Sequence, residues 1–148
     1  MSKRVQDLKL LSFASIVALL VEFIFGTANA LYVTIAPHNP WGASHPIAIL
    51  YLHVIVGLAL LINGVMMVNA SLEQPQSRSL GYSIVGVLGI VIAIAAGLGF
   101  VNGGGKSNLL SLTMALGFSA SLFAYAFLLF HLSRSGDHVR TDPPTRES

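Results

Sequence analysis

Four long apolar runs constrain the fold of this chain more than any other feature of its sequence. They cover residues 8–36, 46–70, 80–102 and 108–132, and each exceeds the ~20 residues that an α-helix needs to cross the hydrocarbon core of a bilayer. Backbone groups in lipid must be satisfied within their own segment, so each run is predicted to form one helix. The sequence therefore predicts an all-α fold, in which residues 1–132 form a four-helix transmembrane bundle with up-down-up-down topology.

The composition agrees with a membrane environment. Only 9% of the residues are charged and the mean hydropathy is +0.75, whereas a soluble domain usually carries about 25% charged residues. Because the chain has no cysteine, disulfides, thiolate metal sites and cysteine nucleophiles are excluded. No metal-ligand spacing, catalytic constellation or basic patch with interleaved aromatics is present. We expect the lipid bilayer as the main partner, other membrane subunits or a second copy as further partners, and no nucleic acid.

The connections between the runs are short. Pro37 and Pro40 are predicted to end the first helix, and Ser44 is predicted to cap the second. The later connections, residues 71–79 and 102–107, are the polar and glycine-rich turns expected between antiparallel helices. Beyond Leu132 the composition turns polar and loses its apolar period. Residues 133–148 are therefore predicted to be a disordered tail.

The distribution of basic residues predicts the orientation. One side of the predicted bundle carries seven of the eight Lys and Arg residues, and the other carries only Lys106. The seven are Lys3, Arg4, Lys9, Arg78, Arg134, Arg140 and Arg146. Basic residues favour the cytoplasmic side, so we expect a multi-pass protein of the cell (inner) membrane with both termini, including the tail, in the cytoplasm. A cleaved signal peptide is the alternative for the first run, but that run is longer than the about 7–15 apolar residues usual in such peptides.

Apart from Lys9 at the start of the first run, Glu22 is the only formal charge inside a run. An ionisable group near the bilayer centre costs at least ~2.5 kcal/mol, so it usually has a partner or a function. Helical spacing places Glu22, Gly26 and Asn29 on one face, which we expect to point inward. Two interpretations stay open: a proton-exchanging site, or a hydrogen-bonded carboxyl that only ties helices together.

His53 is the second polar candidate inside the membrane. It shares a helix face with Gly57, Leu60 and Gly64, and the two glycines would leave space beside the imidazole. Asn63 adds hydrogen-bonding capacity on the same helix, and we expect it to form a polar site with Glu22 and Asn29. The face could accommodate a flat ligand, or a neighbouring helix could satisfy the histidine instead.

Haem b is the cofactor that these positions would suit. Met114, six residues into the fourth run, matches the predicted depth of His53, and histidine with methionine is an established axial pair for haem iron. His45 is the alternative ligand opposite His53. His131 lies at the other end of its helix and is excluded as a partner within one chain.

Small residues recur at helical spacing in the last two runs. They are Gly86, Gly89, Ala93 and Ala96 in the third run, and Gly117, Ala120, Ser121 and Ala124 in the fourth. Such stripes allow helices to approach closely in a membrane. They predict packing faces rather than a functional site.

Three short segments resemble known families. The stretch from His45 to Gly57, with its His53-xxx-Gly57 spacing, resembles one histidine-bearing helix of membrane b-type cytochromes and haem A synthase-like proteins, which implies a haem pocket. The segment from Glu22 to Pro37 resembles uncharacterised small prokaryotic four-helix membrane proteins, in which a Gly-x2-Asn segment precedes a short Pro/His loop. Its first residues, through Thr27, also resemble the carboxyl-bearing helix of small multidrug transporters.

These features leave three functions open. One is a b-type-cytochrome-like or respiratory-chain accessory subunit, with His53 as an axial ligand. Another is a small proton-coupled carrier that uses Glu22. The third is a purely structural or assembly subunit. The sequence leaves open whether the protein is an enzyme.

Overall fold

The computed structural model describes residues 3–36, 38–73 and 77–137. It contains four long helices, and a short helix α2 (Pro40–Ala43) lies between the first two. The long helices are α1 (Lys3–Tyr32), α3 (Ile47–Leu72), α4 (Ser77–Asn102) and α5 (Asn108–Asp137). The predicted all-α four-helix bundle is confirmed.

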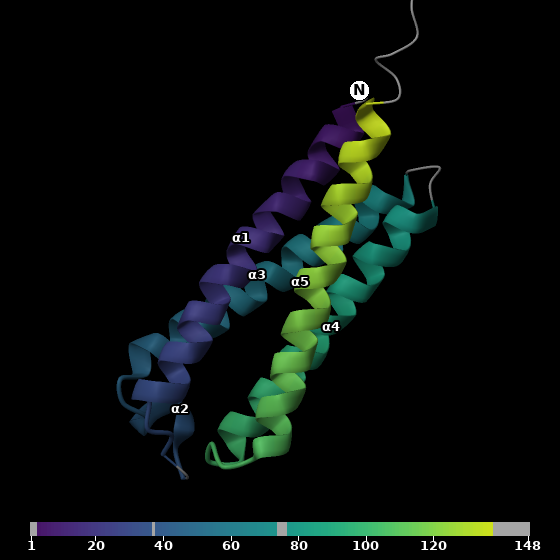
Figure 1. Ribbon diagram of the computed structural model, residues 1–148. Coiled ribbons are helices and arrows are strands. Elements are labelled where there is room, and N and C mark those ends of the chain that lie inside the picture. The colour runs from purple at the N-terminus through teal and green to yellow at the C-terminus, as the bar shows by residue number, and fades with distance from the viewer. Residues whose placement is uncertain (1–2, 37, 74–76, 138–148) are drawn as a thin grey trace, which may run out of the picture.

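The long helices form a four-sided bundle. Helix α1 packs against α3 and α5, and α4 packs against the same two helices, with the largest contact between α4 and α5. Helices α3 and α5 are therefore diagonal neighbours. The start of α1 lies beside the end of α5, and the α2 segment and the α4–α5 turn lie at the opposite end (Figure 1).

The inward-facing residues follow a repeat of alternating three and four residues. On α3 the fully buried positions are Leu50, Gly57, Leu60, Gly64, Met67 and Ser71. This is the spacing of helices that pack at a shallow angle with knobs in holes. The buried apolar cluster includes residues from all four long helices. It consists of Leu8, Leu19, Leu60, Met67, Ile90, Tyr125, Leu128 and Leu132.

The outward-facing surface is apolar. All four long helices are long and apolar enough to cross a membrane. Large side chains such as Phe13, Ile62 and Leu112 are more than half exposed on the isolated chain, a surface that lipid would cover. These four candidate spans identify the chain as a multi-pass membrane protein.

The first helix ends four residues earlier than predicted, at Tyr32. The following backbone is extended, and Thr34 pairs with His45 through two hydrogen bonds of 2.9 and 3.3 Å. Two features favour the early end. Val33, Thr34 and Ile35 are β-branched and have a lower helix propensity, and Pro37 disfavours the helical conformation of the residue before it.

Ser44 does not cap α3, so that prediction is wrong. Its hydroxyl donates to the carbonyl of Pro40 at 2.6 Å and accepts from the N–H of Ala36 at 3.2 Å. The residue before α3 is Pro46, which offers no side-chain cap. Ser44 therefore holds the first connection together instead of starting the next helix.

Helix α5 continues to Asp137, so residues 133–137 are helical and not part of an irregular tail. Arg134 in this last turn lies 4.7 Å from the centre of the Phe130 ring, a favourable cation–π contact. The remainder of the predicted tail, residues 138–148, lies outside the described residues.

The two connections at the α2 end contact each other. The Trp41 indole donates to the side-chain oxygen of Asn102 at 3.1 Å, and the Tyr51 hydroxyl donates to the Trp41 carbonyl at 2.6 Å. Gly105 adopts a φ of +73° and lies against Ile35. Glycine is required here, because other residues rarely adopt that backbone conformation. These contacts join the α1–α3 pair to the α4–α5 pair.

Candidate functional site

Glu22 and His53 meet at the interface of α1 and α3. Glu22 Oε1 lies 3.1 Å from His53 Nδ1. Both side chains belong to membrane-spanning helices, and 14% of the Glu22 side chain and 28% of the His53 side chain are exposed. We refer to these two residues as the Glu22–His53 pair.

A glycine on each helix makes room for the side chain of the other. A Cβ atom added to Gly57 would lie 3.1 Å from Glu22 Oε1, and one added to Gly26 would lie 3.3 Å from His53 Cε1. Each glycine follows its titratable residue by four positions, so the two helices present matching faces. Each side chain of the pair therefore lies against a glycine of the opposite helix.

The pair lies in the half of the bundle that is nearer to α2. Glu22 precedes the end of α1 by ten residues, about 15 Å, and His53 follows the start of α3 by six residues, about 9 Å. Towards the other end of the bundle, the interface continues with Leu19 and Leu60, which are both 2% exposed. Polar access to the pair is therefore expected from the α2 end.

Several polar atoms near this interface are buried without a hydrogen-bond partner in the described structure. They are Glu22 Oε2, His53 Nδ1 and Asn29 Oδ1. Nδ1 of His53 is within ion-pair distance of Glu22, but the direction of the contact is not that of a hydrogen bond. Buried polar atoms are normally satisfied, so these atoms could accept a hydrogen bond or a cation.

Asn63 belongs to a different contact. Its side-chain nitrogen donates to Ser15 Oγ at 2.6 Å and to the Leu11 carbonyl at 3.2 Å. Asn63 follows His53 by ten residues, about 15 Å along α3. It joins α3 to α1 on the far side of Leu60 and is not brought to the Glu22–His53 pair.

The structure brings neither predicted second haem ligand to His53. Met114 Sδ lies 3.2 Å from the place that a Cβ on Gly97 of α4 would take. His45 is exposed in the connection before α3, where its backbone pairs with Thr34. His53 itself faces α1, so the described contacts do not form an axial pair within one chain.

Three or more metal-ligating side chains do not gather anywhere in the described part of the chain. Comparison with protein-family models, with curated proteins and with solved structures finds no match.

Sequence reasoning identified both members of the pair but did not join them. The sequence predicts a face of α1 for Glu22 and a face of α3 for His53, and the contact depends on which faces meet in the bundle. A usable signal was present in the shared spacing of Glu22-xxx-Gly26 and His53-xxx-Gly57. Two such faces on adjacent antiparallel helices can interlock, because each glycine accommodates the opposite long side chain.

Proposed function

We propose that the protein is a small proton-coupled membrane carrier in which the Glu22–His53 pair exchanges a proton for a cationic substrate. The observation that carries the proposal is the 3.1 Å contact between a carboxylate oxygen and an imidazole nitrogen inside membrane-spanning helices. Ionisable residues within such helices often mark proton or substrate paths.

The charge of the pair explains how exchange can work. With one proton on the two groups the site is neutral overall, whether the proton is on the carboxyl or on the imidazole. Loss of that proton leaves one negative charge in a medium of low dielectric constant, where opposite charges attract strongly. A proton and a cation therefore compete for the same site.

The unpaired acceptors favour a cation with N–H groups. Glu22 Oε2 and Asn29 Oδ1 are buried oxygens without partners in the described structure, and both accept hydrogen bonds. Glu22 and Asn29 are seven residues apart on one face of α1, about 10 Å along its axis. A protonated amine that enters from the α2 end would meet Asn29 before it reaches the pair.

Proton release on substrate binding tests the proposal. Detergent-purified protein in weak buffer with a pH indicator is mixed with 2-phenylethylammonium, and separately with tetraphenylphosphonium, which has no N–H donor. We expect proton release with the ammonium ion, weaker release with tetraphenylphosphonium, and none in Glu22→Gln. Glu73→Gln at the end of α3 is the matched control and should behave like the unsubstituted protein. Equal release from Glu22→Gln would contradict the proposal. Absence of release from the unsubstituted protein would contradict it as well and would make the pair a structural contact between helices.

A b-type-cytochrome-like or respiratory-chain accessory subunit is the second candidate function. It is favoured by one observation, the carboxylate beside His53 Nδ1, because ligating histidines commonly face a carboxylate through the nitrogen that does not bind the metal. An absorption spectrum of protein purified from haem-replete cells, oxidised and then reduced with dithionite, separates the candidates. We expect no Soret band if the protein is a carrier, and a Soret band if it is a cytochrome-like subunit.

We further propose that the protein lies in the cell (inner) membrane with both termini in the cytoplasm. The proposal rests on the distribution of basic residues. Seven of them lie on the side of the bundle that carries both termini, and only Lys106 lies on the other side. It places α2 and the Glu22–His53 pair in the outer half of the membrane.

A further inference from the structure

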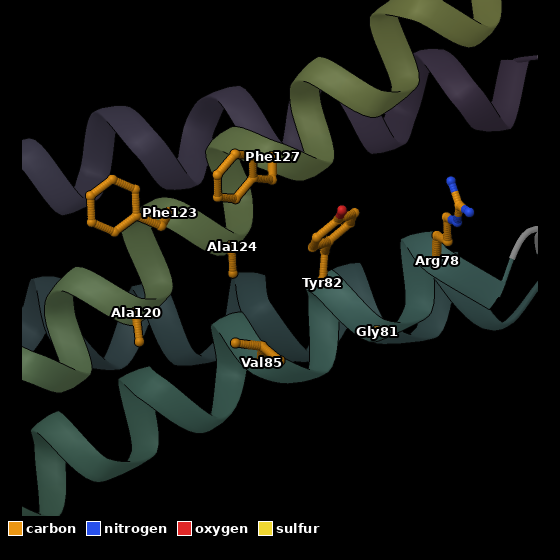
Figure 2. A pocket seen from close by; sticks show the side chains of 8 residues that line it. All are labelled: Arg78, Gly81, Tyr82, Val85, Ala120, Phe123, Ala124 and Phe127. Atoms are coloured by element: carbon orange, nitrogen blue, oxygen red, sulfur yellow. The ribbon is translucent and has the colours of Figure 1, made fainter.

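A groove of about 490 Å³ runs between α4 and α5 on the outer surface of the bundle. Its floor is made by small residues, Gly81, Ala120 and Ala124, and its walls include the rings of Tyr82, Phe123 and Phe127 (Figure 2). Arg78 lines the end of the groove where α4 begins. We refer to this feature as the α4–α5 groove.

We propose that the α4–α5 groove binds an anionic phospholipid, with one acyl chain along the floor and the phosphate group beside Arg78. This inference is independent of the proposed carrier function, because the groove and the Glu22–His53 pair lie on different helices. It assigns a ligand to a surface that otherwise contacts only bulk lipid.

The dimensions of the groove fit one acyl chain within one leaflet. Its α4 wall runs from Arg78 to Val85, seven residues or about 10 Å. One leaflet contributes about 15 Å of hydrocarbon. Arg78 is the first residue of the apolar span of α4, so its guanidinium lies at the depth of the lipid headgroups.

The shape of the groove favours a chain over a second helix. Phe123 and Phe127 are more than half exposed and stand beside the recessed floor. Close helix pairing in membranes needs small residues that let backbones approach, and the exposed Phe123 and Phe127 rings would hold a second helix away from the small residues of the floor. The Tyr82 and Phe127 rings lie 6.3 Å apart, and their contact supports one wall of the groove.

Charge determines which lipid would be preferred. The side chains of Arg78 and Tyr82 extend from the same side of α4 (Figure 2). Arginine pairs with phosphate through two parallel hydrogen bonds, and basic side chains at membrane interfaces attract anionic lipids. A phosphatidylglycerol headgroup keeps a net negative charge beside Arg78, whereas phosphatidylcholine is neutral overall.

Lipid binding in mixed micelles tests the proposal. Detergent-purified full-length protein is incubated with equal amounts of phosphatidylglycerol and phosphatidylcholine, and the bound lipids are counted by native mass spectrometry. We expect phosphatidylglycerol to dominate in the unsubstituted protein. Arg78→Gln should reduce the ratio of the two lipids by about fivefold, the effect of one basic side chain near a headgroup. Lys106→Gln removes the same charge at the other end of the bundle and should leave the ratio unchanged.

A second variant fills the groove without disturbing the fold. A Cβ atom added at Gly81 meets nothing within 4 Å, so Gly81→Leu should fold normally and displace the acyl chain of either lipid. Ala59→Leu adds similar apolar bulk to an exposed site on α3 and should retain the lipid. Unchanged lipid counts in both Arg78→Gln and Gly81→Leu would overturn the proposal. So would loss of a dimer in Gly81→Leu with no loss of lipid, because the groove would then bind a second copy.

Discussion

At the scale of single residues, Glu22 and His53 depend on each other. A charge that loses its partner in a buried site destabilises a protein more than removal of both charges, since the remaining group is left uncompensated. We expect Glu22→Leu and His53→Leu each to lower the stability of the bundle, and the double variant to be more stable than the sum of the single effects predicts. The coupling should be about 1–2 kcal/mol, as for other contacting polar pairs.

Unfolding of the four proteins by denaturant in detergent measures this coupling. Glu22→Gln is the conservative control, because it keeps the shape of the side chain beside Gly57. It should retain most of the stability while it removes the titrating group. Additive effects of the two Leu substitutions would show that the 3.1 Å contact does not stabilise the fold.

Asn63 should behave differently from the pair. Its amide donates to Ser15 and to the Leu11 carbonyl, and loss of a buried hydrogen bond costs about 1 kcal/mol. Asn63→Ala is therefore expected to lower the unfolding midpoint and to leave cation-dependent proton release unchanged. Loss of proton release in this variant, at normal protein yield, would extend the functional site to the far side of Leu60.

The sequence predicted the helix faces of these residues but not their partners. Helical spacing alone placed Glu22 with Asn29 and His53 with Gly57. The predicted grouping of Asn63 with Glu22 and Asn29 used only their polar character, and the predicted pairing of Met114 with His53 used only depth in the membrane. Depth cannot determine which neighbouring helix a side chain faces, and the structure places Met114 against α4.

At the scale of helices, α4 and α5 approach closely at Gly89 and Gly117. A Cβ atom added to either glycine would lie 2.6 Å from the carbonyl oxygen of the other, and backbone cannot move aside as a flexible side chain can. Gly89→Ala and Gly117→Ala should each destabilise the bundle by about 1–3 kcal/mol through overpacking. The sequence predicts that these small residues act in helix packing, and the contact between Gly89 and Gly117 is where they do so.

Gly81→Ala is the matched control for this prediction. It lies on the same helix α4 and its added Cβ would meet nothing within 4 Å. Alanine is favoured over glycine in a helix by about 1 kcal/mol, so this variant should be at least as stable as the unsubstituted protein. Thermal unfolding in detergent measures the stability of the three variants. Equal melting temperatures for all three would contradict the expected overpacking at Gly89 and Gly117.

The four helices were predictable from hydropathy, but their ends were less so. Apolar runs report where lipid lies, whereas backbone hydrogen bonds determine where a helix stops. Helices α1 and α5 therefore extend beyond their apolar runs, to Lys3 and Asp137. At the other end of α1 the run stays apolar through Ala36, but the pairing of Thr34 with His45 replaces the last turn.

At the scale of the whole molecule, both extramembrane connections at the α2 end must lie on one side of the membrane. The hydrogen bond between Trp41 and Asn102 joins them directly. The start of α1 and the end of α5 lie together at the opposite end (Figure 1). The fold therefore requires an even number of crossings, and the basic residues then determine which end faces the cytoplasm.

Cysteine labelling of intact cells tests this topology, because the natural chain has no cysteine to interfere. Single cysteines replace four exposed residues: His38 and Lys106 at the α2 end, and Glu73 and Ser133 at the other. An impermeant maleimide should label the first two in intact cells, and the second two only after the membrane is opened. Reversal of all four results would keep the fold and invert the orientation. Labelling of His38→Cys and Glu73→Cys from the same side would instead contradict the crossing of α3, and with it the placement of the Glu22–His53 pair inside the membrane.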